Sequence, residues 1–168
     1  MSRQEKPTIG QLEAMASHVV YEIDMFRRGF ARWRTLHEDD PDWNPALENA
    51  LLHFRVLREF FLDPPKKADD VAASDYSEDW DPLLPRILED TKEEIDKRLA
   101  HLTLQRLIRP GPWKRGEMEA AMESLITSFK KSLVGREATW FFRLGVKSSA
   151  KIIVGDVCGS TESTTKGS

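Results

Sequence analysis

The chain has a single cysteine, no long apolar run and little excess charge of either sign. Cys158 has no second cysteine with which to form an intramolecular disulfide, and one thiol does not build a zinc cluster. No apolar stretch approaches the roughly 20 residues that a membrane-spanning helix needs. No apolar segment behind residues 1–7 resembles a signal peptide. We therefore expect a cytoplasmic protein with no membrane partner and no cofactor.

A basic surplus is also missing, since the net charge is −3. Dedicated nucleic-acid-binding proteins usually carry an excess of Lys and Arg, so we do not expect a nucleic-acid partner. The chain lacks a nucleophile elbow and a glycine-rich phosphate loop. Its 40% hydrophobic and 32% charged residues are typical of an ordinary globular protein, and its 168 residues fit one domain.

Hydrophobic residues recur at three- and four-residue intervals, which is the spacing of amphipathic helices. This spacing predicts helices over residues 8–37, 44–62, 82–109 and 116–133. We therefore expect an all-α fold, an up-and-down four-helix bundle with a long acidic loop between helices two and three.

The predicted layout has a disordered N-terminus at residues 1–7, the bundle at 8–135 and a C-terminal extension at 136–168. The Gly-Ser-Thr-rich end of this extension predicts partial disorder. Within it, residues 137–144 could form a helix, whereas residues 151–154 resemble a short strand.

Local signals mark where the first two helices begin. Thr8 and Gln11 have the spacing of a capping box. Asn44 is the expected N-cap of the second helix, with Pro45 at its first helical position. Four arginines in the last turns of the first helix are interpreted as a solvated face that suits the helix dipole: Arg27, Arg28, Arg32 and Arg34.

Acidic residues dominate the stretch from Asp63 to Asp96, which has twelve of them against four basic residues. Its first part, to about residue 82, is an unusually long connection, and such loops are often functional or mobile. Val71, Tyr76 and Trp80 predict that this connection packs onto the helices.

Histidines and arginines lie on or beside the apolar stripes of helices two and three. A buried charge needs a partner, and removing that partner costs roughly 3–5 kcal/mol. We therefore expect Arg55 or Arg58, and Arg98 or Arg106, to pair with aspartates of the acidic loop. His53 and His101 are expected to anchor the acidic loop at residues 69–71 to the bundle. The candidate polar site comprises His53, Arg55, Arg58, Asp69, Asp70, Asp75, Arg98, His101 and Arg106.

A metal interpretation uses the same region. His53 and His101 with Asp69 or Asp70 would give three ligands and an open position, as catalytic zinc prefers; His18 lies where it could join them. No His-x-x-x-His or Glu-x-x-His pair specifies such a site, so we expect no metal.

Arg32 and His37 have the arginine–histidine spacing found in the HEPN nucleases, which are also small helical bundles. The match departs from that family because Trp33 stands where a polar residue is usual. It also lies at the end of the first helix, whereas the family motif lies late in its bundle. We interpret it as a chance match in an arginine-rich stretch.

Two segments together resemble a pattern found in a group of small bacterial all-helical proteins without an established activity. The first joins residues 49–61 (NALLHFRVLREFF) to residues 69–76 (DDVAASDY), and the second is residues 95–106 (IDKRLAHLTLQR). The resemblance covers roughly residues 12–133 in layout. It implies a helical fold and a focus on these segments, but no reaction.

We expect a non-enzymatic binding or interaction module. Leu52, Val56 and Phe60 widen the apolar surface of the second helix beyond the need of one intramolecular partner, which would suit a homo-oligomer or a protein partner. The alternative is a hydrolase or HEPN-like nuclease, with or without a metal, centred on His53 and His101. The sequence leaves open whether the protein is an enzyme, because it does not give the distance between these histidines.

Overall fold

The computed structural model describes residues 6–100 and 112–145. Within these residues every regular element is helical and no strand occurs, which confirms the predicted all-α class. In chain order the elements are α1 (Ile9–Thr35), α2 (Trp43–Leu62), the 3₁₀ turn η1 (Ala73–Asp75), α3 (Arg86–Ile95), the π-helical segment η2 (Asp96–Ala100), α4 (Arg115–Ser132) and α5 (Gly135–Gly145).

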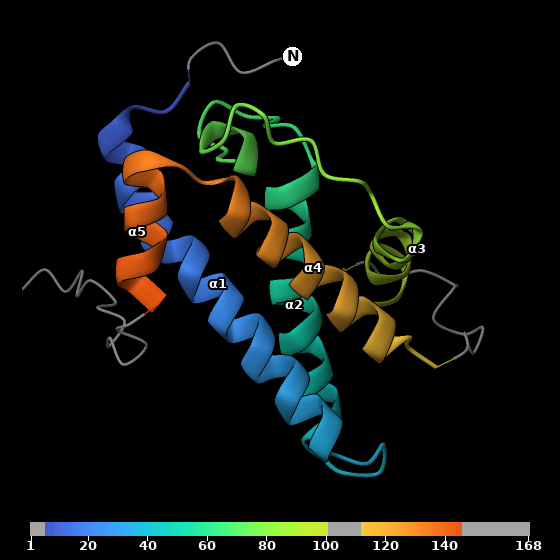
Figure 1. Ribbon diagram of the computed structural model, residues 1–168. Helices are drawn as coiled ribbons and strands as arrows, with labels where there is room; N and C mark the ends of the chain where they lie inside the picture. Colours follow the sequence, from blue (N-terminus) through green and yellow to red (C-terminus); the bar gives the residue numbers. More distant parts are fainter. Residues whose placement is uncertain (1–5, 101–111, 146–168) are drawn as a thin grey trace, which may run out of the picture.

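The α1 and α2 helices form an antiparallel hairpin, and α4 lies across one face of it (Figure 1). α5 packs against α1, while α3 contacts both α2 and α4. Among the described residues, no helix is both long enough and apolar enough to cross a membrane.

The start of α1 follows its sequence signal. The Gln11 amide donates to Thr8 Oγ1 at 3.3 Å, and the Thr8 amide donates to Gln11 Oε1 at 2.8 Å. This reciprocal pair is the predicted capping box, which satisfies amide groups that the first turn of a helix leaves without partners.

The start of α2 corrects a prediction. The helix begins at Trp43, so Asn44 and Pro45 lie inside its first turn. The Asp42 amide donates to Asp40 Oδ1 at 2.8 Å and the Trp43 amide donates to the Asp40 carbonyl at 2.9 Å, so the chain is already turning before Asn44. Pro45 is tolerated there because a first-turn residue needs no intrahelical donor.

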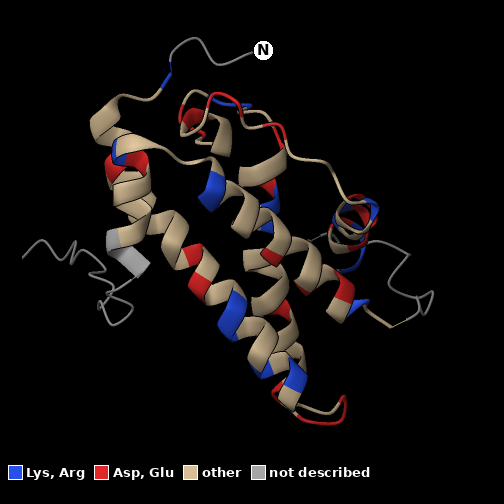
Figure 2. Cartoon of the chain, in the orientation of Figure 1, with Lys and Arg blue, Asp and Glu red and all other residues tan. Residues whose placement is uncertain are grey.

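The connection from α2 to α3 packs onto the helices, as its aromatic residues predict. The Tyr76 hydroxyl donates to the Leu12 carbonyl of α1 at 2.9 Å, and Trp80 Nε1 donates to the Phe61 carbonyl at 2.7 Å. Both rings lie near Phe129 of α4, with centroids 6.1 and 5.4 Å from its ring. Figure 2 shows acidic residues along this connection.

The C-terminal part of the described chain adds a helix to the core. Gly135 begins α5 with a φ of +59°, a conformation that glycine adopts without strain. The predicted helix at 137–144 is confirmed as part of α5, whose Trp140 and Phe141 are buried. The strand expected at 151–154 and the end of the third predicted helix lie outside the described residues.

Candidate functional site

His53 is held by Glu22, which was not among the predicted site residues. Its Nδ1 atom lies 2.7 Å from Oε2 of Glu22 on α1, and its ring meets Tyr21 edge-on with centroids 6.0 Å apart. His53 is buried, with 7% of its surface exposed. The expected role for His53, to hold the Asp69–Asp70 loop, is therefore wrong in its partner, because the bond joins α2 to α1.

Arg58 is a buried cation with a hydrogen-bond partner on α3 and a second at the end of α2. Its Nε donates to the Leu88 carbonyl of α3 at 3.0 Å, and its Nη1 donates to Asp63 Oδ1 at 2.8 Å. Asp63 is the first residue of the acidic segment, so the structure pairs this arginine with the segment as expected, although through an aspartate that was not among the candidates.

Asp63 gathers three cations at the end of α2. Its Oδ2 atom accepts hydrogen bonds from Lys66 and from Lys92, each at 3.1 Å, in addition to the Arg58 bond to Oδ1. Burial acts to raise the pKa of Asp63, but the bonds from Lys66, Lys92 and Arg58 outweigh it and lower the pKa to about 2. The carboxylate therefore fastens α2, the connection and α3 together.

The other candidate arginines face different partners. Arg55 lies 3.1 Å from Glu59 on its own helix and 3.3 Å from Asp96 of η2. Arg98 lies 3.7 Å from Glu94, and its guanidinium stands 3.9 Å from the centre of the Trp113 ring. Desolvation lowers the pKa of Arg98, and Glu94 opposes that change. Arg98 thus faces Glu94 and Trp113 instead of the loop aspartates. The expected pairing named Arg98 or Arg106, and Arg106 lies outside the described residues, so the pairing stays a prediction.

Two of the candidate loop aspartates, Asp70 and Asp75, bind backbone amides within the connection. Asp70 Oδ2 accepts the amides of Lys66 and Lys67, both at 2.8 Å, and these bonds lower its pKa. Asp75 Oδ2 accepts the Ala72 amide at 3.0 Å. Asp69 is exposed.

Two predicted residues, His101 and Arg106, lie outside the described part of the chain, so the structure gives no distance from His53 to His101. Within residues 6–100 and 112–145, no three His, Cys, Asp or Glu side chains are grouped as a metal site requires. The HEPN-like residues lie at the α1–α2 turn, where Arg32 binds Asp42 at 3.0 Å and the exposed His37 lies 3.3 Å from Asp39.

The arginines at the end of α1 are not simply a solvated face. Arg27 donates two hydrogen bonds to Glu123 of α4, both at 2.7 Å, and these bonds raise the pKa of Arg27. Arg34 reaches Glu119 of α4 at 3.2 Å. These ion pairs attach α4 to one face of the α1–α2 hairpin.

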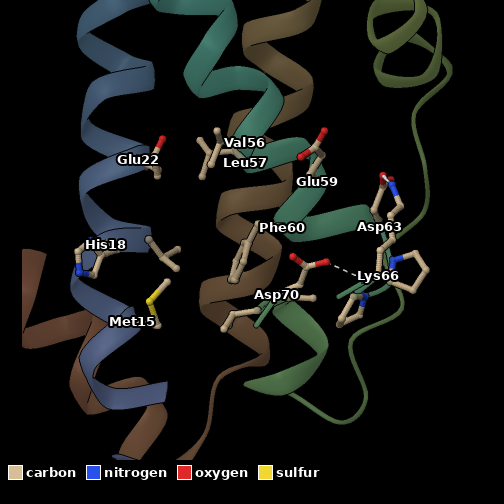
Figure 3. A pocket seen from close by; sticks show the side chains of 15 residues that line it. Met15, His18, Glu22, Val56, Leu57, Glu59, Phe60, Asp63, Lys66 and Asp70 are labelled. Carbon is tan, nitrogen blue, oxygen red and sulfur yellow. Dashed lines mark hydrogen bonds and ion pairs between the residues drawn. The ribbon is translucent and has the colours of Figure 1, made fainter. Parts of the chain in front are cut away.

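A half-open cavity of about 440 Å³ lies between α1, the C-terminal half of α2 and the start of the connection. Figure 3 views it with the ribbon of α4 behind the α1–α2 hairpin, so it opens on the opposite face. Its lining combines apolar with charged side chains: Met15, His18, Val19, Glu22, Val56, Leu57, Glu59, Phe60, Asp63, Pro64, Pro65, Lys66, Asp70, Val71 and Ala72.

Exposed apolar side chains on both helices extend this cavity. Leu52 and Val56, one turn apart on α2, are 57% and 38% exposed, and Met15 on α1 is 36% exposed. Phe60, which was expected to share this surface, lines the cavity but is mostly buried, with its ring beside Phe129. We call Met15, Leu52, Val56 and the cavity lining the α1–α2 groove.

The α1–α2 groove offers shape, apolar area and carboxylates, but no activated nucleophile among the described residues. The sequence pattern predicted Leu52 and Val56 as exposed apolar residues but did not predict Glu22, although Glu22 lies at the edge of the apolar stripe of α1. Comparisons of the chain with models of protein families, with curated proteins and with solved structures find no match. The resemblance to a group of bacterial helical proteins therefore stays a prediction.

Proposed function

We propose that the protein is a non-enzymatic interaction module that binds an amphipathic helix of a partner protein in the α1–α2 groove. The observation that carries this proposal is the run of exposed apolar side chains, Leu52, Val56 and Met15, that continues into a cavity of about 440 Å³. Contiguous exposed apolar surface, unlike single scattered apolar residues, is typical of an interaction site.

A helix suits this surface better than an extended peptide. Two adjacent antiparallel helices leave a lengthwise groove between them, and an amphipathic helix fills such a groove with apolar residues at positions i, i+3 or i+4, and i+7. A peptide that binds as an added β-strand would instead need a sheet edge, and the described residues contain no strand.

The test uses selection from a random peptide library, with the protein as bait. We expect enriched peptides with helical apolar spacing, and we expect Leu52→Asp and Val56→Asp to weaken their binding at least about tenfold, because each places a charge in an apolar contact. Leu83→Asp is the matched control, because Leu83 is 92% exposed in the connection before α3. Enriched peptides that bind all three variants as well as the wild type would refute the proposal.

For the whole chain we retain the four-helix up-and-down architecture as a proposal, with α1, α2, α3 continued by η2, and α4 as the four helices. Residues 63–82 would then be the acidic connection, and α5 an addition packed on α1. The cytoplasmic location, the bacterial origin and the alternative hydrolase or nuclease at His53 and His101 stay predictions.

A further inference from the structure

Carboxylates flank the apolar centre of the α1–α2 groove. Figure 3 shows Glu22 of α1 on one side of Val56 and Leu57, and Glu59 of α2 on the other. Among the described residues, the lining holds four carboxylates and one lysine, Lys66. An apolar floor with an acidic margin on each side is complementary to a helix whose apolar stripe has basic residues on both flanks.

The internal partners of these carboxylates decide which of them can receive a cation. Asp63 already binds three cations and Asp70 accepts two backbone amides, so neither is suited to another basic group. Glu59 shares Arg55 with Asp96, and its side chain is 44% exposed. Glu22 binds the neighbouring His53, and its side chain is 23% exposed. A carboxylate has about four acceptor positions, so one such bond leaves room for an incoming donor.

We propose that the partner helix is basic, with Lys or Arg beside its apolar stripe, and that Glu22 and Glu59 bind those residues. This inference rests on the proposed function and adds the charge of the partner. Electrostatic complementarity of this kind selects partners and speeds association more than it adds affinity.

The same charges argue against a second copy of the chain as the occupant. In a two-fold dimer formed through this groove, the same patch from both copies meets across the axis. Glu22 and Glu59 of one copy would then lie against the equally acidic groove of the other, and like charges placed together in an interface are unfavourable. An acidic or phosphate-bearing partner meets the same repulsion.

The inference can be tested with two synthetic 18-residue peptides that share one Leu-rich helical stripe. One carries Lys at the flanking positions and the other carries Glu. Their binding to the full chain is measured by fluorescence anisotropy at low and at physiological salt. We expect the Lys peptide to bind at least about tenfold more tightly at low salt, with a difference that shrinks as salt screens the charges.

Charge-removing variants identify the groups responsible. Glu22→Gln and Glu59→Gln should each weaken binding of the Lys peptide about two- to fivefold, the range for exposed charge pairs, and leave the Glu peptide unaffected or slightly better bound. Glu117→Gln is the control, because Glu117 is exposed in the first turn of α4, which lies across the other face of the hairpin. Thermal unfolding checks that each variant is folded.

The outcomes separate this inference from the proposed function. Equal binding of both peptides, lost in Val56→Asp, would overturn the basic partner but keep the helix-binding groove. Binding of neither peptide would contradict the proposed function itself. Sedimentation that shows a dimer of the wild type and a monomer of Leu52→Asp would assign the groove to a second copy and overturn the inference.

Discussion

His53 of α2 and Glu22 of α1 form a hydrogen-bonded pair, with 2.7 Å between Nδ1 and Oε2, near the middle of both helices. The pair lies beside the α1–α2 groove, since Glu22 contributes to its lining. It therefore sets the lateral position of two helices whose other contacts are mostly apolar and less directional.

From this pair we predict that the stability losses caused by substituting His53 and Glu22 are not additive. His53→Ala should lower the free energy of unfolding by about 1–3 kcal/mol, because a buried ring is lost and a partly buried carboxylate is left without its partner. Urea unfolding at neutral pH of His53→Ala, Glu22→Ala and the double variant measures the coupling between them, which we expect to be at least about 0.5 kcal/mol. His18→Ala, at an exposed position of the same groove, is the control. Additive losses would show that the two side chains act independently.

The low pKa of Asp63 predicts how the stability of the fold depends on pH. Its folded-state pKa of about 2 lies below the ordinary value of 3.8, so its contribution is complete above pH 3.8 and is lost as pH falls toward 2. The difference corresponds to about 2 kcal/mol at neutral pH. Asp63→Asn should therefore lower stability by about this amount at pH 7 and by much less near pH 2.

Unfolding measured across this pH range checks the dependence on Asp63, with the exposed Asp81→Asn as the control. Equal destabilisation by Asp63→Asn at both ends of the range would mean that charge is not the reason for its effect. Loss of stability would then come from altered packing at the end of α2.

Tyr76 tests whether the acidic connection is fastened to the helices. Burial raises the pKa of its hydroxyl, which stays protonated and donates to the Leu12 carbonyl at 2.9 Å. Tyr76→Phe keeps the aromatic packing and removes this bond, so we expect a loss of about 1 kcal/mol. Hydrogen exchange should also quicken in the amides of η1. Tyr21→Phe, on the α1 side of His53, should change exchange in η1 little, and equal exchange in both variants would argue against the role of the hydroxyl.

Local signals in the sequence predicted what depends on neighbours along the chain. The capping box of Thr8 and Gln11, the end of α2 before Pro64 and the burial of Tyr76 follow from short-range sterics, hydrogen bonding and apolar character. These features need no knowledge of how the helices are rotated about their axes.

Partners across helices were not predictable in the same way. Periodicity shows which face of a helix is buried, but it does not show which residue of another helix lies opposite. Glu22 and His53 are 31 residues apart, and Arg27 and Glu123 are 96 apart. The pairing of Asp63 with Arg58 was more accessible from the sequence, because Asp63 follows Arg58 by only five residues at the end of the same helix.

A close approach of the α1 and α2 backbones at Gly29 gives the last prediction. A Cβ atom on Gly29 would lie 2.9 Å from the Ala50 Cα and 3.1 Å from its amide nitrogen, and backbone atoms at that distance cannot yield without moving a helix. Gly29→Ala should therefore separate the hairpin and lower the free energy of unfolding by about 1–3 kcal/mol, although alanine is the better helix former. Gly10→Ala in the same helix meets nothing within 4 Å and should be neutral or stabilising by up to about 1 kcal/mol. Because the α1–α2 groove depends on this spacing, Gly29→Ala should also weaken peptide binding, whereas Gly10→Ala should not. Urea unfolding and anisotropy on the two variants measure both effects, and a stabilised Gly29→Ala protein would contradict the close approach.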